Sequence, residues 1–432
     1  MNKHWSRYNF LMEIENNKFL LYNSFTNNLL EIDPDDYKIL QQIEKGDYCN
    51  ITDELLQELN ENLILVENDD ILAQKIKLAR IKNRFKQDSL VLAIAPTIAC
   101  NFACSYCFEE EYTSKGNTIN ADTANNIISF ISSHKNLQML QVVWYGGEPL
   151  LAFDKIVFLT KRIQALSIDN YSAFMITNGY LLDRKKIEQL KGLCISKIQI
   201  TIDGLSETHN KRRPHKTNKD SFQKIVNNII ELFEIYPEIF VNIRVDIDKN
   251  NADEFFELNS YLKNKITNPK LSLYPAYVAE YNNSCSKSSC ILNRLDQSDF
   301  ILKNGYKYPF EKYYYPQTSI TECSARSENS YGIGPKGELY KCWCDVGRDE
   351  KSIGNVRDGI TNTELYTRYM VDADPLYEQE CLTCSYLPIC NGGCPFMKLK
   401  NKDGDNLDVC IIQKDKLKEF FTLYYNKNET NK

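Results

Sequence analysis

The segment "IACNFACSYCFEE", residues 98–110, places three cysteines on one short stretch of the chain. Cys100, Cys104 and Cys107 are separated by three residues and then by two, and no fourth cysteine follows nearby. Three thiolates can hold three irons of a cubane iron–sulfur cluster, whereas a structural zinc site takes four protein ligands, usually as two pairs. The spacing therefore indicates a cluster whose fourth iron is left for a ligand from outside the protein.

The composition is that of a globular protein with many cysteines. The chain has 432 residues, a net charge of −6 and 15 cysteines. The length predicts two to three domains, and the charge gives no reason to expect nucleic acid as a partner. We read no signal peptide at the N-terminus, and no apolar run approaches the roughly 20 residues of a membrane-spanning helix. We therefore expect a cytoplasmic protein without a membrane partner, in which grouped cysteines bind metal.

Strand-like and helix-like segments alternate between residues 88 and 280, which predicts an α/β fold with βαβ units and a parallel sheet. The helical segments include residues 220–235, whose apolar residues fall on one face. Six such units can curl into an open, partial barrel. The predicted strands are "LVLAIAP", "LQVVWYGG", "SAFMITNG", "KIQITIDG", "FVNIRVDI" and "LSLYPAYV".

Polar and glycine-rich segments follow the first four of these strands. The cysteine loop follows the first strand and "GGEP" (146–149) the second, while "TNG" (177–179) and "DG" (203–204) follow the third and fourth. In α/β folds the chemistry takes place at the carboxyl ends of the strands. Because all four segments lie at the same edge of the sheet, we expect one site there.

The cysteine spacing, with an aromatic residue just before the third cysteine, resembles the signature of the radical S-adenosylmethionine (radical SAM) enzymes. The "GGEP" segment in its place after the second strand strengthens the resemblance, which spans about 200 residues. It implies a partial (βα)6 barrel, a 4Fe-4S cluster, and SAM bound at the open iron through its amino and carboxylate groups. Reduction would then split SAM into methionine and a 5′-deoxyadenosyl radical, which abstracts hydrogen from the substrate.

The resemblance also implies which residues contact SAM. Gly146, Gly147 and Glu148 match the motif that holds its amino group. Asn178 and Thr201 fall where the family contacts the ribose or the methionine. Asn178 and Thr201 could instead have an ordinary role in capping strand ends, and Arg244 could instead be a surface charge. The predicted cofactor-binding residues are Tyr106, Gly146, Gly147, Glu148, Asn178, Thr201 and Arg244, the last as a partner for the SAM carboxylate.

The region from residue 316 to 432 resembles the SPASM domain, a seven-cysteine appendage of radical SAM enzymes that act on peptides and proteins. The resemblance implies two auxiliary 4Fe-4S clusters and therefore three clusters in all. Two structural zinc sites are the alternative. The outer cluster would be held by Cys381, Cys384, Cys390 and Cys410, and the inner one by Cys323, Cys342 and Cys394. The fourth place of the inner cluster is open to Cys344, Cys285, Cys290 or a substrate thiol, and we expect Cys49 and Cys194 to be buried apolar residues.

The first 85 residues predict two strands, "YNFLMEI" and "KFLLYNS", two helices, and a closing hairpin around "LILVENDDIL". A basic stretch, "KIKLARIKNRFK", predicts a solvated linker helix. The pattern resembles the small winged-helix module that binds leader peptides at a sheet edge in peptide-modifying enzymes. A capping or dimerisation domain is the alternative. The predicted domains are thus 1–85 for leader recognition, 86–315 for the barrel, and 316–432 for the SPASM region.

Together these features predict a radical SAM oxidoreductase that matures a ribosomally made peptide (RiPP). It would close a thioether, carbon–carbon or carbon–oxygen cross-link in a precursor peptide that carries a leader, with flavodoxin or ferredoxin as electron donor. The alternatives are a sulfatase-type maturase that forms formylglycine, which the front region disfavours, and a non-catalytic iron–sulfur electron carrier or zinc-binding protein. The basic segment "HNKRRPHK" (209–216) either touches SAM or substrate or is a solvated charge run.

Overall fold

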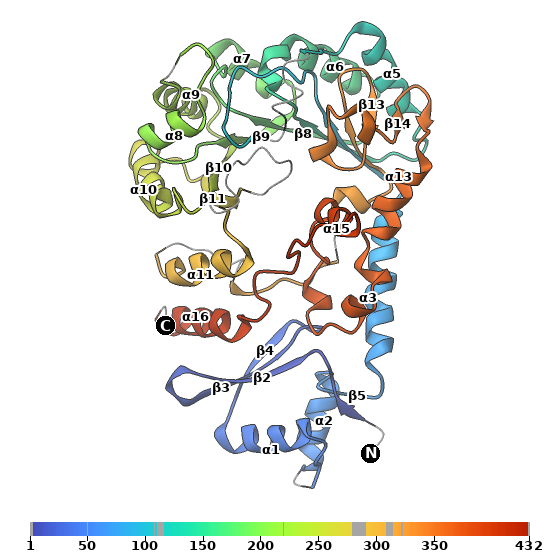
Figure 1. Ribbon diagram of the computed structural model, residues 1–432, viewed down its shortest axis with the longest axis vertical. Helices are drawn as coiled ribbons and strands as arrows, with labels where there is room; N and C mark the ends of the chain where they lie inside the picture. The colour runs from blue at the N-terminus through green and yellow to red at the C-terminus, as the bar shows by residue number, and fades with distance from the viewer. Residues whose placement is uncertain are drawn as a thin grey trace. The chain divides into compact units, whose positions relative to one another are not determined.

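The computed structural model describes residues 3–49, 51–107, 109, 116–218, 220–278, 291–307, 314–320 and 323–430 (Figure 1). The chain forms two compact units. We call the unit that contains Lys86–Leu292 and Glu328–Arg368 the barrel unit. We call the other, which contains Met1–Phe85, Asn293–Ser327 and Tyr369–Lys432, the composite unit because it is built from three separate segments.

The barrel unit is organised around a ten-stranded sheet in the order β11-β10-β9-β8-β7-β6-β12-β13-β14-β15. All six predicted strands are confirmed, and each pairs in parallel with its neighbour. Their apolar residues are almost fully buried, as expected for a parallel sheet covered by helices. These strands are β6 (Ser89–Ile94), β7 (Met139–Trp144), β8 (Asn170–Thr177), β9 (Ile195–Thr201), β10 (Phe240–Ile247) and β11 (Leu271–Tyr277).

Helices follow the parallel strands along the outside of this curved sheet (Figure 1). The predicted helix at 220–235 is confirmed as α9 (Phe222–Ile235), which buries Ile225, Val226, Ile229 and Leu232. The others are α5 (Ala121–Ser132), α6 (Phe153–Gln164), α7 (Arg184–Leu190), α8 (Ser206–Arg212), α10 (Phe255–Lys265) and α13 (Thr363–Thr367).

Part of the cysteine-rich C-terminal region extends the barrel sheet. Strand β12 pairs in parallel with β6, and three antiparallel strands continue from it. Residues 328–368 therefore pack with the barrel, whereas residues 369–432 pack in the composite unit. The three-domain division into 1–85, 86–315 and 316–432 stays a prediction. The added strands are β12 (Ser330–Ile333), β13 (Glu338–Tyr340), β14 (Gly354–Asn355) and β15 (Gly359–Ile360).

The N-terminal segment of the composite unit forms a three-stranded antiparallel sheet in the order β2-β3-β4. The two predicted strands are confirmed as β2 (Asn9–Ile14) and β3 (Lys18–Asn23), and β4 (Asn28–Ile32) is a further strand that the sequence reading missed. The two predicted helices are α1 (Pro34–Glu44) and α2 (Asp53–Glu61).

The predicted closing hairpin is wrong. Strand β5 (Leu65–Val66) pairs instead with β1 (His4–Trp5) at the start of the chain. The "ENDD" segment begins helix α3 (Asp69–Arg84), because the Asn68 side chain accepts a hydrogen bond from the amide of Asp70. Asp69 is buried and accepts a hydrogen bond from the Ser6 hydroxyl at 2.7 Å, which fixes the helix against the first residues.

Helix α3 includes most of the basic stretch, but two of its arginines are not solvated, contrary to the prediction. Arg80 is buried and donates hydrogen bonds to the backbone carbonyls of Ser319 (3.1 Å), Leu387 (2.8 Å) and Cys390 (2.8 Å). A charged side chain is buried only where its donors find acceptors, and here the acceptors come from the irregular C-terminal chain. Helix α3 therefore holds the C-terminal chain in place within the composite unit.

The core of the composite unit mixes residues from the front and the end of the chain. Tyr22 of β3 packs with Ile389 and Phe421, and Tyr8 lies in a second cluster with Leu387. The remaining helices of this unit are α11 (Arg294–Asn304), α14 (Gln379–Leu382), α15 (Pro395–Lys402) and α16 (Leu417–Thr430). No helix in the described part of the chain is long and apolar enough to cross a membrane.

Candidate active site

A cavity of about 350 Å³ lies in the barrel unit at the carboxyl ends of the parallel strands. The three cysteines of the first loop line it, as do residues that follow β7, end β9 and lie on β10. The sequence prediction that these segments meet at one edge is confirmed by this arrangement. The predicted site residues that line the cavity are Cys100, Cys104, Cys107, Tyr106, Gly146, Gly147, Asn178, Thr201 and Arg244.

The surroundings of the cysteine loop favour the neutral form of its thiols. Burial raises the pKa of both Cys100 and Cys107 to about 12, so in the metal-free protein they are neutral thiols. A bound iron would deprotonate them, because a coordinating cation reverses the effect of burial. The Phe102 amide donates a hydrogen bond to Cys100 Sγ at 3.4 Å, which would stabilise a thiolate there.

The three cysteines of this loop form a donor set at one cavity, which Cys100, Cys104 and Cys107 all line. Thiolates are the protein ligands of cubane iron–sulfur clusters, and each binds a separate iron. These residues therefore fit such a cluster.

The two glycines after β7 let the cysteine loop approach the end of this strand. A Cβ atom on Gly147 would lie 2.4 Å from the carbonyl oxygens of Ile98 and Ala99, far inside contact distance. Gly146 has a φ of +116°, which other residues rarely adopt. The Gly147 amide donates to the Thr97 carbonyl at 3.3 Å. Any larger residue at Gly147 would push the cysteine loop out of place.

Glu148 is fully buried beneath this edge, and burial raises its pKa. Its carboxylate accepts hydrogen bonds from the Thr177 hydroxyl at 2.7 Å and from the amides of Asn178 at 2.7 Å and Leu150 at 2.9 Å. The Asn178 side chain in turn donates to Asn101 Oδ1 at 2.8 Å. Glu148 thus couples the ends of β7 and β8 to the cysteine loop.

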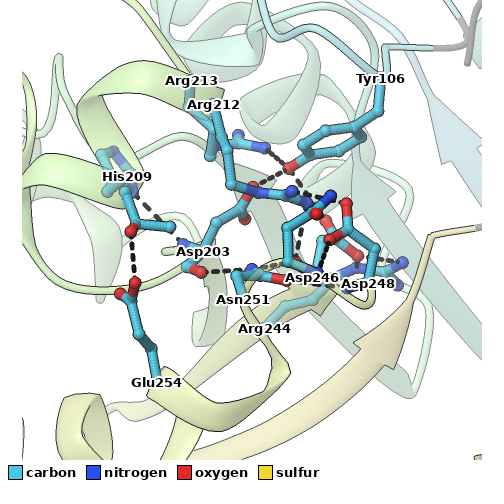
Figure 2. A network of polar contacts seen from close by, with 12 residues as sticks. Tyr106, Asp203, His209, Arg212, Arg213, Arg244, Asp246, Asp248, Asn251 and Glu254 are labelled. Carbon is cyan, nitrogen blue, oxygen red and sulfur yellow. Dashed lines mark hydrogen bonds and ion pairs between the residues drawn. The ribbon is translucent and has the colours of Figure 1, made fainter. Parts of the chain in front are cut away.

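Tyr106 belongs to a polar network that closes one side of the cavity (Figure 2). Its hydroxyl donates a hydrogen bond to Asp203 at 2.6 Å and accepts one from Arg213 at 2.6 Å. Arg212 lies over the Tyr106 ring and forms ion pairs with Asp203 at 3.2 Å and Asp248 at 2.6 Å. The aromatic residue before the third cysteine is therefore fixed by two arginines.

The three arginines near the cavity differ in their partners. Arg212 pairs with two carboxylates, and Arg244 pairs with Asp246 at 2.8 Å. In the described residues, Arg213 has a hydrogen bond to Tyr106 but forms no ion pair, although it lines the cavity. Asp203 and Asp246 lie near enough to raise the pKa of Arg213, but neither contacts its guanidinium as Asp246 contacts that of Arg244.

The segment 209–216 carries functional residues that the sequence reading left undecided. His209 is fully buried, its Nδ1 accepts from the Asp203 amide at 3.4 Å, and burial lowers its pKa to about 3. A solvated charge run is wrong for His209, Arg212 and Arg213, while Lys211 and Lys216 are exposed. His209 and Arg212 are three positions apart in α8, so they share one face of this helix. Their spacing was a signal that this face points inward.

The cavity lining also contains a partly buried carboxyl group and two aromatic rings. Tyr145 donates a hydrogen bond to Glu109 at 2.9 Å, and burial raises the pKa of Glu109 to about 7. The rings of Tyr145 and Trp343 have centroids 5.9 Å apart. Cys344, one candidate for the fourth ligand of the inner cluster, also lines this cavity.

A second cavity, of about 330 Å³, lies in the composite unit and is lined by Cys381, Cys384, Cys390 and Cys410. These are the four residues predicted for the outer auxiliary cluster. The Tyr386 amide donates to Cys384 Sγ at 3.4 Å, and the Gly392 amide donates to Cys390 Sγ at 3.2 Å. Hydrogen bonds of this kind stabilise thiolates, so the second cavity also fits an iron–sulfur cluster.

The other cysteines give a mixed outcome. Of the inner set, Cys323 and Cys394 belong to the composite unit and Cys342 to the barrel unit. Cys285 and Cys290 lie outside the described residues. The prediction that Cys49 and Cys194 are buried is wrong, because Cys49 is exposed and Cys194 is partly exposed. Both lie outside the helices and strands, where the chain offers them no apolar neighbours along a regular face.

Comparison with known families assigns the first cavity. Residues 94–262 match the radical SAM superfamily, and the match includes the cysteine loop and strands β7–β10. These residues form a radical SAM domain. Such domains use SAM and a 4Fe-4S cluster, which agrees with the three cysteines that line the cavity.

Two curated relatives of the whole chain are also radical SAM or maturase proteins. The radical SAM cyclopropyl synthase TigE of Paramaledivibacter caminithermalis is 24% identical over 436 residues, covering 90% of this chain and 89% of the relative. The cysteine-type anaerobic sulfatase-maturating enzyme of Clostridium perfringens is 24% identical over 353 residues, covering 73% of this chain and 91% of the relative.

Solved structures confirm the fold around the radical SAM domain. The sulfatase-maturating enzyme anSMEcpe, with bound AdoMet and a peptide, has a TM-score of 0.60 at 22% identity over 78% of this chain and 97% of that chain. SuiB of Streptococcus suis, bound to its precursor peptide SuiA, has a TM-score of 0.52 at 17% identity over 92% of this chain and 97% of that chain. This chain thus contains a radical SAM domain and is similar to RiPP modifiers and to sulfatase maturases.

Proposed function

We propose that the protein is a radical SAM/SPASM maturase that closes an intramolecular cross-link in a ribosomally made precursor peptide. The observation that carries this proposal is that three cysteines, two glycines and Arg213 line one cavity at the ends of the barrel strands. The likeness to SuiB and to TigE along almost the whole chain supports a peptide substrate. SAM and the first cluster would supply the hydrogen-abstracting radical.

The residues of the cavity would bind and orient SAM. The three loop cysteines would hold the cluster, and Asn178 and Thr201 would contact the ribose or methionine. Glu148 would position Asn178 by accepting the hydrogen bond from the Asn178 backbone amide. The sequence predicted Arg244 as the partner of the SAM carboxylate, but its guanidinium is paired with Asp246. We therefore assign the SAM carboxylate to Arg213.

The composite unit would hold the outer electron-transfer centre. Four cysteines around one cavity support the outer auxiliary cluster, and the sequence spacing supports an inner one with Cys323, Cys342 and Cys394. These clusters would supply an acceptor for the electron that is released when a cross-link forms. Flavodoxin or ferredoxin remains our proposal for the external electron donor.

The three-stranded sheet at the front of the chain is proposed to bind the leader. Strand β4 is at one edge of this sheet in the order β2-β3-β4, and an extended peptide could add to that edge. Packing of residues 1–85 with residues 369–432 in one unit makes a deletion of the first 85 residues an unsuitable test.

We expect the backbone amides of β4 (Asn28–Ile32) to exchange hydrogen more slowly when the precursor peptide is added. An added strand would occupy the edge donors that now face outward. Hydrogen-exchange mass spectrometry of the full protein checks this, with the β1–β5 pair as an internal control that should not change. Equal exchange in β4 with saturating peptide would contradict leader binding at this edge.

The function itself is tested by co-expressing the protein, without oxygen, with a short peptide encoded beside its gene. We expect the peptide to lose the mass of two hydrogens, and to stay unchanged with a Cys100→Ala/Cys104→Ala/Cys107→Ala variant. An unchanged peptide together with 5′-deoxyadenosine formation would mean that radical chemistry occurs on another substrate.

A sulfatase-type maturase is the second candidate, because a relative and structural neighbour of that kind each cover at least 73% of this chain. Oxidation of serine to formylglycine also removes two hydrogens, so mass alone does not separate that reaction from a cross-link. Conversion of cysteine to formylglycine replaces sulfur by oxygen and gives a different mass. Formylglycine is an aldehyde and reacts with a hydrazide probe, whereas a cross-linked residue does not. A labelled product would therefore favour this second function over the first.

A further inference from the structure

Two lysines lie against the cysteines of the second cavity. The Lys398 side chain, on α15, is only 5% exposed, and its Nζ lies 3.9 Å from Cys381 Sγ. Lys414 Nζ lies 3.3 Å from Cys410 Sγ. Both lysines line the cavity with the four cysteines. The cysteines at the two ends of the predicted ligand set thus each have an ammonium group as neighbour.

The burial of Lys398 calls for compensating negative charge. Buried lysines are rare unless they are paired, and the carboxylate that Lys398 contacts is Glu378. Glu378 is shared, because Lys402 Nζ lies 3.7 Å from its other oxygen. One carboxylate therefore serves two ammonium groups, and it also accepts a hydrogen bond from the Cys381 thiol at 3.5 Å. Two ammonium groups against one carboxylate leave a net positive charge beside this sulfur atom. Four cysteine thiolates around a cluster would supply the missing negative charge.

An ammonium group at such a distance acts on the charge state of a cluster. One-electron reduction adds one negative charge, and a nearby fixed positive charge stabilises the reduced form more than the oxidised form. Water screens this effect where the group is exposed. Lys398 should therefore act more strongly than Lys414, which is partly exposed and next to the exposed Cys410.

We propose that Lys398 and Lys414 raise the reduction potential of the cluster held by Cys381, Cys384, Cys390 and Cys410, so that it accepts electrons. This inference rests on the proposed function, since it presumes a cluster in the second cavity. In this inference the two lysines set the reduction potential of the cluster, and Lys398 is the main contributor. Glu378 keeps Lys398 in position and limits the size of its effect.

The test is a redox titration followed by electron paramagnetic resonance, in full-length reconstituted protein that carries Cys100→Ala, Cys104→Ala and Cys107→Ala to remove the first cluster's signal. The second-cavity signal is identified as the one that a further Cys381→Ala change removes, together with about four irons. If this change removes neither iron nor signal, the cavity holds no cluster, and both the inference and the auxiliary-cluster part of the proposed function are overturned.

With the signal assigned, we expect Lys398→Met to shift its midpoint potential downward at unchanged iron content. Lys414→Met should shift it in the same direction by less, and Lys398→Arg should restore most of the wild-type value. Lys400→Met is the matched control on the same helix, because Lys400 pairs with Asp405 at 3.2 Å and should cause no shift.

Two results would overturn the inference while leaving the proposed function intact. The first is an unchanged or raised potential in Lys398→Met with the cluster present. The second result concerns the case in which Lys398→Met loses its iron, so that its potential cannot be measured. Lys414→Met is then the deciding variant, and an unchanged midpoint potential in Lys414→Met refutes the proposal.

Discussion

The Arg213→Gln variant is expected to bind SAM roughly 30-fold or more weakly, and to form correspondingly less 5′-deoxyadenosine at limiting SAM. Loss of a buried charge that pairs with a ligand typically costs about 2 kcal/mol or more, and each 1.4 kcal/mol is tenfold in affinity. Glutamine can still donate a hydrogen bond to Tyr106, which keeps the wall of the cavity in place. Equilibrium dialysis with anaerobically reconstituted protein measures the change.

The matched control for this prediction is Arg244→Gln, which changes the same residue type in the same cavity. Its guanidinium is already paired with Asp246, so we expect a smaller loss of SAM affinity. Iron content and visible absorption should be unchanged in both variants, which separates SAM binding from cluster loss. A larger effect of Arg244→Gln than of Arg213→Gln would return the carboxylate role to Arg244.

The Arg84→Met variant is expected to lower the free energy of unfolding of the composite unit by about 3–5 kcal/mol. Arg84 and Asp374 form an ion pair at 2.8 Å with side chains 3% and 1% exposed. Removing one partner leaves the other charge buried without compensation, which is the costly case for buried ion pairs. The urea midpoint, followed by circular dichroism, reports the loss.

A double variant shows whether the loss comes from the unpaired charge. Arg84→Met with Asp374→Asn leaves no buried charge, and asparagine can still accept the hydrogen bond that Asp374 receives from the Leu376 amide at 2.9 Å. We expect the double variant to recover much of the lost stability. Lys82→Met, at an exposed position of the same helix, should change the free energy by no more than about 0.5 kcal/mol. Equal losses in the single and double variants would contradict the charge argument.

The barrel strands and the place of the site were predictable because a parallel sheet is buried on both faces. Its strands are therefore continuous apolar runs, and their carboxyl ends meet at one edge whatever the helices between them do. The three cysteines on one loop carry their chemistry in their spacing, which needs no tertiary information. The second set of four cysteines was also predicted to act together, and those residues line one cavity.

The features that were missed depend on contacts between distant segments. Nothing in "NNLLEID" distinguishes β4 from a loop until β3 lies beside it. Arg80 and Arg84 look solvated because a basic helix normally is, and their carbonyl and carboxylate partners lie hundreds of positions away. Arg213 could be separated from Arg244 only by seeing which of them has a carboxylate beside it. Local sequence carries no record of such pairings.

The composite unit has a consequence for how the protein is made. Its first segment leaves the ribosome early, yet its core partners, such as Phe421, and the partner of Arg84, Asp374, are synthesised last. At the usual speed of synthesis the interval is on the order of tens of seconds. During that time Tyr22 and two arginines meant for burial are exposed to water. The first segment of this unit therefore cannot complete its core until residues as late as Phe421 have been synthesised.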